Sequence, residues 1–275
     1  MTGHITQSYG IRERVPVENP VDAAIESLRT LGYALIDGGY DETELAAFSQ
    51  AFDAAHAAAH AAAGGRETLE PIDEHNTVRV PFAYDRRLLA LALNPRIREI
   101  AARLIGGYQV LSQQNGVINP PDFQTYNQAA WHRDLPYQHV VFSRPLAINA
   151  LFCLDEFTTD NGATLVLPAT HKQEEFPSEQ FVGRCAIQVT APRGCYIVLD
   201  SMIFHTGATN RTPVPRRAVN NVYVSPILRQ QIDLPAFLGE HFTDDPDLRR
   251  LLGYEVATPR SDAEYFAERR RKLQG

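Results

Sequence analysis

The sequence predicts a mainly β fold with added helices, and three observations support this class. Strand-like runs rich in β-branched and aromatic residues dominate the middle of the chain, from about residue 108 to residue 224. Helical patterns fill much of the preceding 106 residues. The length of 275 residues and the hydrophobic content of 44% are sufficient for one full core. We therefore expect a single domain, without an internal repeat or a long linker.

The expected domain has four segments. They are a loosely held polar arm over residues 1–18, a mainly helical layer over 19–106, a strand-rich core over 107–226 and a helical C-terminal region over 227–275.

The composition argues against two kinds of partner. A net charge of −7 and an isoelectric point of about 5.7 are opposite to the basic surface of a nucleic-acid-binding protein. No apolar run approaches the length of a membrane span, and the first residues do not begin a signal-peptide core.

Three cysteines without CxxC spacing indicate free thiols in a reducing compartment: Cys153, Cys185 and Cys195. We expect a cytoplasmic protein.

The helical layer carries clear start signals. Asn19 is a favoured N-cap, and the proline after it suits the first helical position. Asp41 with Glu44 three residues later resembles a capping box, and it precedes a longer helix that runs through the alanine-rich stretch 54–63. Further patterns predict a short strand over 33–36 and helices over 86–92 and 96–104.

Three potential metal ligands share one face of the alanine-rich helix. Asp53, His56 and His60 are spaced at i, i+3 and i+7. Seven residues of helix separate Asp53 from His60 by about 10.5 Å, which is too far for all three to reach one ion. His56 and His60 alone could bind a metal, although a solvated helix face is the simpler interpretation.

The strand-rich core contains a second set of candidate ligands. Its strands are expected over 108–114, 146–157, 195–199 and 218–224, and residues 115–122 are expected to form a loop that is well placed to cover a site. His132 and Asp134 lie two residues apart, so on an extended strand their side chains point to the same face. Tyr126 and Gln128 would share that face if the strand is unbroken.

A second histidine completes a three-ligand pattern. His205 follows a β-rich run at the expected exit of a buried strand. Together with His132 and Asp134 it would form a 2-His-1-carboxylate triad, which holds non-heme Fe(II) and leaves coordination positions open for a co-substrate and dioxygen. Eleven positions later Arg216 enters another strand, where its planar guanidinium could bind a carboxylate through two parallel hydrogen bonds. Without the two histidines, an ordinary surface charge would be the simpler interpretation of Arg216.

In order and spacing these motifs resemble the phytanoyl-CoA dioxygenase family of Fe(II)/2-oxoglutarate-dependent oxygenases. The resemblance extends from about residue 19 to about residue 226. It rests on His132-x-Asp134, the segment 160–172 and the run from His205 through Asn210 to Arg216. The resemblance implies a double-stranded β-helix, a cupin-like jelly roll, with iron near one mouth of the barrel and 2-oxoglutarate as co-substrate.

The resemblance also implies further co-substrate contacts. It places a contact near Gln114 and a basic residue near Arg79. The family often has Gly-Ser after the distal histidine, whereas this chain has Thr206-Gly207, so Thr206 or Thr209 would have to replace the serine. Arg217 is close enough to exchange roles with Arg216, and the sequence leaves that choice open.

The carboxylate ligand bears on the type of reaction. Related halogenases carry a small residue in its place, so the presence of Asp134 favours hydroxylation of an unactivated C–H bond, with release of succinate and CO2. The residues after the carboxylate supply candidate substrate contacts, namely Tyr137, His139 and Arg144. The arginines Arg79, Arg133 and Arg144 are compatible with an anionic small-molecule substrate and equally with ordinary surface charges.

Two other functions share the same ligand pattern. A Zn(II) hydrolase or isomerase on a cupin-like barrel would use the same three residues and a water molecule. A metal-binding module that kept the fold but lost turnover is the non-enzymatic alternative. Neither would form succinate from 2-oxoglutarate in an oxygen-dependent reaction.

Overall fold

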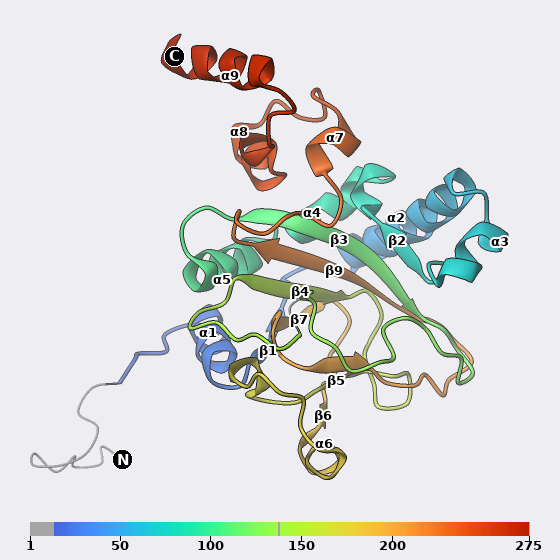
Figure 1. Cartoon of the computed structure of the whole chain (residues 1–275). Helices are drawn as coiled ribbons and strands as arrows, with labels where there is room; N and C mark the ends of the chain where they lie inside the picture. The colour runs from blue at the N-terminus through green and yellow to red at the C-terminus, as the bar shows by residue number, and fades with distance from the viewer. Residues whose placement is uncertain (1–13, 137, 275) are drawn as a thin grey trace, which may run out of the picture.

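The computed structural model describes residues 14–136 and 138–274, and two antiparallel sheets lie at its centre (Figure 1). The strand order is β1-β7-β4-β9-β3-β2 in the larger sheet and β6-β5-β8 in the smaller one. The strands are β1 Tyr33–Asp37, β2 Thr77–Arg79, β3 Val110–Asn119, β4 Ala147–Cys153, β5 Thr164–Val166, β6 Ile187–Gln188, β7 Cys195–Asp200, β8 His205–Gly207 and β9 Arg216–Val224. This arrangement agrees with the mainly β class that the sequence predicts.

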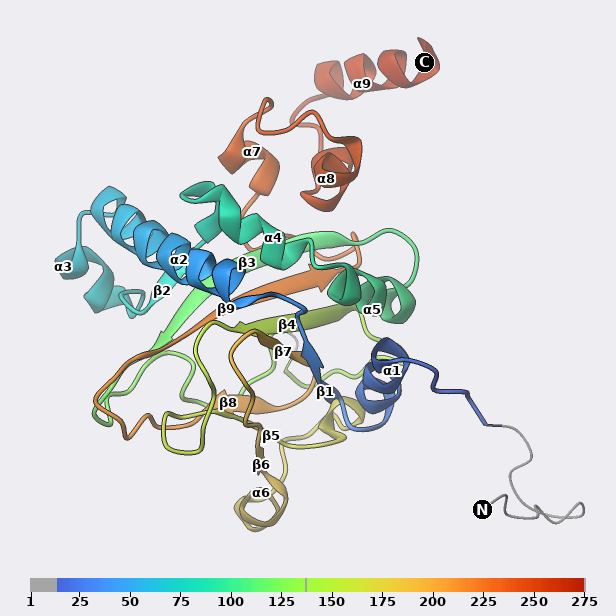
Figure 2. The ribbon, with the colours of Figure 1, turned by 180° about the vertical axis from the view of Figure 1, so that it is seen from behind.

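Helices cover one face of the larger sheet, on the side away from the smaller sheet (Figure 2). The four that do so are α1, α2, α4 and α5. The α-helices are α1 Pro20–Thr30, α2 Glu42–Ala62, α3 Arg66–Leu69, α4 Leu89–Ala92, α5 Pro95–Ile105, α6 Glu179–Cys185, α7 Leu234–Leu238, α8 Pro246–Leu251 and α9 Asp262–Gln274. The larger sheet therefore separates a helical layer from the smaller sheet.

The start signals of the first two long helices are confirmed. The side chain of Asn19 accepts a hydrogen bond from the Asp22 amide, 3.0 Å away. Asp41 accepts from the Glu44 amide, and the Glu44 carboxylate accepts from the Asp41 amide, which completes the capping box. Each contact satisfies an amide that the first turn of a helix leaves unpaired.

Strand β7 shows why the middle strands of the larger sheet are apolar along their whole length. Tyr196 and Val198 pack into the core under the helices, whereas Ile197 and Leu199 pack into a second core between the sheets. Because successive side chains alternate faces and both faces are covered, every position of the strand is buried.

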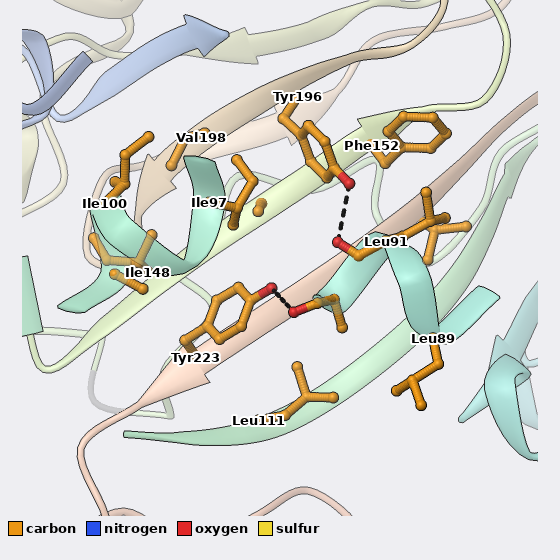
Figure 3. Packing of buried hydrophobic residues seen from close by; sticks show 14 of the residues in the cluster. Leu89, Leu91, Ile97, Ile100, Leu111, Ile148, Phe152, Tyr196, Val198 and Tyr223 are labelled. Atoms are coloured by element: carbon orange, nitrogen blue, oxygen red, sulfur yellow. Dashed lines mark hydrogen bonds between the residues drawn. The ribbon is translucent and has the colours of Figure 1, made fainter. Parts of the chain in front are cut away.

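Two buried tyrosines fix the helical layer to the larger sheet (Figure 3). The Tyr196 hydroxyl donates a hydrogen bond to the Leu91 carbonyl at 2.9 Å, and the Tyr223 hydroxyl donates to the Ala92 carbonyl at 2.8 Å. Both carbonyls belong to the last turn of α4, where no amide of the helix is available to them. The sheet thus satisfies buried acceptors of the helix that covers it.

We expect Tyr223→Phe to lower the free energy of unfolding by about 1–3 kcal/mol, because it leaves the buried Ala92 carbonyl without its donor. Urea denaturation of the purified chain would measure the change. Tyr265→Phe, which removes an exposed hydroxyl on α9, is the matched control and should leave stability unchanged. Equal stabilities for the two variants would contradict the expected role of the Tyr223 hydroxyl.

One local expectation is wrong, and one condition set in the sequence analysis is not met. Residues 115–119 belong to β3, which continues to Asn119 and pairs along its length with β9, so the expected covering loop over 115–122 does not form as a unit. The approach to His132 is not one unbroken strand, because residues 123–131 have turns and no strand pairing. Only His132 itself forms an isolated antiparallel bridge, with His205.

The C-terminal region is helical, as expected, and α9 stands apart from the sheets in both views (Figures 1 and 2). At the start of α9 the Ser261 hydroxyl accepts a hydrogen bond from the Glu264 amide. Within residues 14–136 and 138–274, none of the helices combines the length and apolarity that a membrane crossing needs.

Candidate metal centre

His132, Asp134 and His205 converge between the two sheets. The amide of His132 donates to the His205 carbonyl at 3.0 Å, and the amide of His205 donates back to the His132 carbonyl at 3.1 Å. The Asp134 amide donates to the Ser201 carbonyl, which holds the next part of the segment beside the end of β7. Because His132 and Asp134 lie two residues apart on this extended segment, both side chains face His205.

The ligand atoms of the three residues are close enough to share one ion. All lie within 4.8 Å of one another. The Asp134 carboxylate lies 3.6 Å from His132 Nε2 and 3.5 Å from His205 Nε2. His132 Nε2 and Asp134 Oδ2 are buried and have no hydrogen-bond partner, which is costly unless another ligand satisfies them.

The other ring nitrogens orient both imidazoles. His132 Nδ1 lies 2.7 Å from the Ala130 carbonyl, and His205 Nδ1 lies 3.1 Å from the Ile203 carbonyl. A carbonyl can only accept, so each Nδ1 carries the proton and each Nε2 keeps a free lone pair. This is the tautomer that a metal requires, with the outer hydrogen bond that usually supports a histidine ligand.

Electrostatics favour an ionised Asp134 and a neutral His205, whereas the carboxylate beside His132 favours the protonated form of that ring. Burial acts to raise the pKa of Asp134, but the neighbouring His205 and His132 outweigh it and lower the pKa below its ordinary value. Burial lowers the pKa of His205. Burial also acts to lower the pKa of His132, but the nearby Asp134 carboxylate raises it overall. The set offers a carboxylate and imidazole nitrogens, which suit a divalent iron ion.

A cavity of about 50 Å³ adjoins the three residues. Its walls come from both sheets and from the segment before His132. The lining residues are Val117, Tyr126, Gln128, His132, Asp134, Asn149, Leu151, Thr164, Leu199, His205, Gly207, Arg216, Ala218 and Asn220. Arg216 thus shares a cavity with the candidate metal ligands, as the sequence suggested.

Arg216 is a buried cation without an anionic partner. Its side-chain nitrogens donate to the main-chain carbonyls of Asn161 and Gly162, and its guanidinium lies 3.8 Å from the centre of the Phe157 ring. Among the described residues no carboxylate lies within ion-pair distance of it. Burial lowers the pKa of Arg216, which reflects the cost of its uncompensated charge. A carboxylate ligand in the cavity would offset that cost.

Arg217 occupies the opposite face of β9. Its guanidinium forms ion pairs with Asp155 at 2.8 Å and with Asp53 at 2.7 Å. These contacts use its hydrogen-bond donors on the helical side of the sheet and raise the pKa of Arg217. Of the two neighbouring arginines, Arg216 is the one that faces the cavity.

Three residues expected near the co-substrate do not line the cavity. Gln114 is buried on the helical side, where its amide donates to the Leu88 carbonyl at 2.9 Å. Arg79 is paired with Glu74 and donates to Gln231 at 3.2 Å. The Thr206 hydroxyl donates to the Gln128 carbonyl, and the neighbouring Gly207 faces the cavity instead.

The candidate substrate contacts are also separate from the cavity. His139 and Arg144 are exposed, and Arg144 lines a different surface pocket beside Lys172. Tyr137 lies outside the described residues. Arg133, which hinted at an anionic substrate, is buried and donates to the carbonyls of Gln138, Thr170, Gln173 and Glu174. Its contacts are those of a structural arginine that holds a loop.

Sequence reasoning missed three polar residues of the cavity wall: Asn149, Thr164 and Asn220. A polar residue inside an otherwise apolar strand was the available signal, most clearly for Asn149 in β4. Tyr126 and Gln128 do line the cavity, although the unbroken strand on which that expectation depended does not form.

We expect Gly207→Ala to weaken 2-oxoglutarate binding about tenfold or more, since a new Cβ would meet the Tyr126 hydroxyl at 1.8 Å and overpacking of this kind costs about 1–3 kcal/mol. Anaerobic titration with 2-oxoglutarate would measure the affinity. Gly183→Ala is the matched control, because its Cβ would meet nothing within 4 Å. A Gly207→Ala chain with unchanged affinity would show that the position of Tyr126 has no influence on the site.

Comparison with known proteins places the chain in a family. Residues 28–218 match the sequence profile described as phytanoyl-CoA dioxygenase. An uncharacterized protein of Mycobacterium tuberculosis, Rv1501, is 30% identical over 260 residues, which cover 92% of this chain and 94% of the relative. The dioxygenase af480 of Aspergillus fumigatus is 29% identical, with 75% of this chain and 70% of that protein covered.

The fold also has a solved counterpart. The crystal structure of EctD from S. alaskensis with 2-oxoglutarate and 5-hydroxyectoine superposes with a TM-score of 0.62 at 22% identity, covering 82% of this chain and 87% of that one. This likeness confirms the predicted jelly roll with added helices. The chain therefore belongs to the phytanoyl-CoA dioxygenase family, and it is an Fe(II)- and 2-oxoglutarate-dependent dioxygenase.

Proposed function

We propose that the protein hydroxylates an unactivated C–H bond of a small-molecule substrate. One oxygen atom of dioxygen enters the product as a hydroxyl group, and the other enters succinate as 2-oxoglutarate loses CO2. The observation that carries this proposal is the shared cavity of Asp134, with its two histidines, and Arg216. An intact carboxylate favours hydroxylation over transfer of another group.

The residues of the chain have distinct roles in this proposal. His132, Asp134 and His205 would hold the iron through Nε2, a carboxylate oxygen and Nε2. Arg216 would bind the far carboxylate of 2-oxoglutarate, and the Tyr126 hydroxyl beside its guanidinium would support it. When bound, the iron and 2-oxoglutarate supply the oxidising chemistry. The protein contributes placement, and the surrounding apolar wall of Leu151 and Leu199 excludes water.

The cavity wall bears on the substrate. Among the described residues Arg216 is the sole cationic side chain that lines it apart from the candidate metal ligands. If Arg216 binds the co-substrate, the prime substrate meets amides and a hydroxyl group, from Gln128, Asn149, Asn220 and Thr164. We therefore expect a small, polar substrate that is recognised by hydrogen bonds rather than by charge. One relative is an ectoine dioxygenase, which is compatible with a small polar substrate.

Anaerobic addition of Fe(II) and then 2-oxoglutarate tests the site directly. We expect a weak visible charge-transfer band from the chelate, and succinate release that depends on oxygen once a substrate is present. A Zn(II) hydrolase or isomerase would give neither signal, and a module without turnover would release no succinate, whether or not it binds the chelate. Screening metabolites by succinate release, followed by mass spectrometry for a gain of one oxygen atom, would identify the substrate. An oxidised product without that gain would contradict hydroxylation.

A cytoplasmic location is still a prediction. It is supported by the state of the three cysteines, which are all free, with Cys153 and Cys195 buried. Fractionation of cells that express the chain would test it.

A further inference from the structure

Aromatic side chains stand next to both histidines of the candidate metal centre. Trp131 directly precedes His132, and Phe204 directly precedes His205. Because successive side chains of an extended segment point to opposite faces, we expect both rings on the outer face, away from the candidate metal ligands. Neither ring lines the cavity beside those ligands.

Phe176 joins the two rings from a third segment, between β5 and α6 (Figure 1). The centre of its ring lies 6.0 Å from that of Trp131 and 4.9 Å from that of Phe204. The planes of Phe176 and Phe204 meet at 85°, an edge-to-face arrangement that is favourable for aromatic rings. One side chain thus contacts the immediate neighbours of both histidines. We call Trp131, Phe176 and Phe204 the outer clamp.

Arg133 fixes the segment that carries Phe176. It is buried, and its guanidinium donates hydrogen bonds to three main-chain carbonyls of that segment, those of Thr170, Gln173 and Glu174. The same guanidinium lies 3.9 Å from the centre of the Phe204 ring, a distance at which a cation and an aromatic face attract each other. In the sequence Arg133 lies between two of the candidate ligands. The outer clamp is therefore attached to the chain right beside the metal centre.

The two histidines themselves are joined by a short main-chain contact. His132 and His205 exchange two hydrogen bonds, of 3.0 and 3.1 Å, and His132 belongs to no longer strand. An isolated bridge of this kind can pivot, and a pivot would change the distance between the two Nε2 atoms on the inner face. Contacts on the outer face oppose that movement.

We propose that Phe176 is a positioning residue for the iron, acting through Trp131 and Phe204 on the two imidazoles. Its ring holds the outer faces of both segments, so the imidazoles keep the separation that one ion requires. Groups that orient metal ligands typically change metal affinity by about 10- to 100-fold. This inference rests on the metal site of the proposed function and adds a residue that lies outside the cavity.

Phe176→Ala should weaken Fe(II) binding about tenfold, at the lower end of the effect of such groups because the main-chain bridge between the histidines remains. The visible band of the anaerobic chelate with 2-oxoglutarate should also shift, since it responds to the arrangement of the iron ligands. Phe176→Tyr keeps the ring and should restore both properties. Phe176→Leu keeps an apolar contact without the edge-to-face geometry and should restore only part.

The metal-free chain offers a second measurement, because Trp131 is its only tryptophan. Removal of the Phe176 ring should expose Trp131 to water and move its fluorescence emission to longer wavelength. Phe176→Tyr should keep the original emission. This measurement reports on the outer clamp itself and needs no iron, co-substrate or substrate.

Phe181→Ala is the matched control, because it removes a ring of similar exposure, 37% against 40%, without an aromatic contact among the described residues. It should leave iron affinity, the chelate band and the emission unchanged. If Phe176→Ala lowered stability to urea but changed neither iron affinity nor the band, its role would be structural and the proposal overturned. Equal iron affinities in the two variants would also overturn it. An unsubstituted chain that binds no Fe(II) would overturn the metal site itself, so the two failures are distinguishable.

Discussion

Replacing Asp134 with alanine should reduce Fe(II) affinity and turnover by more than about 100-fold, since loss of residues that only support metal ligands already costs about 10- to 100-fold. The carboxylate is the one anionic group of the proposed triad, and its pKa is lowered by the two imidazoles, so it carries charge at neutral pH. Without it, His132 and His205 would hold a dication with neutral groups only. Fe(II) titration and succinate release would measure the two effects.

Asp244→Ala is the matched control for this variant, because it removes an exposed carboxylate far along the chain from the site. It should keep both iron binding and activity. The melting temperature of the metal-free Asp134→Ala chain should be measured beside these two effects, because it separates loss of the metal site from loss of folding. A fully active Asp134→Ala protein would refute the assignment of the metal site.

Replacing Arg216 should produce the second large effect, a loss of 2-oxoglutarate affinity of at least about 30-fold. Truncation of one partner of a buried, hydrogen-bonded charge pair typically costs about 2–5 kcal/mol. Arg216→Lys should rescue little of this loss, because a lysine ammonium cannot reproduce two parallel hydrogen bonds to a carboxylate. Iron binding without co-substrate should persist, because Arg216 is not among the candidate metal ligands.

The neighbouring arginine supplies the control. Arg217→Gln breaks ion pairs with Asp53 and Asp155 on the helical side, so it should lower stability while 2-oxoglutarate affinity stays near the original value. Anaerobic titration and urea denaturation of both variants would separate the two roles. If both variants lost 2-oxoglutarate affinity equally, the face of β9 on which each arginine lies would not determine the co-substrate contact.

Predictions from the sequence were accurate for features that depend only on residues a few positions apart. The caps at Asn19 and Asp41 depend on side chains a few residues away, and both form as predicted. The common direction of His132 and Asp134 depends only on their spacing, and it holds although the segment is not a regular strand.

One irregularity in β3 explains why Gln114, which the family resemblance placed near the co-substrate, does not line the cavity. The pairing of β3 with β9 shifts between Leu111 and Gln113, so simple alternation from Val110 does not carry through to Gln114. Gln114 turns to the helical side and bonds the Leu88 carbonyl. The sequence contains no strong signal for such a shift, because it depends on how two strands more than 100 residues apart pair.

The sequence by itself determined the chemical groups of the candidate centre, since the order of two histidines, one aspartate and one arginine is a property of the chain. Only the tertiary structure decided that Arg216 and not Arg217 faces the cavity, and that Asn149, Thr164 and Asn220 complete its wall. The reason is physical: alternation along a strand states which residues share a face, but the packing of distant segments selects which face lies inside.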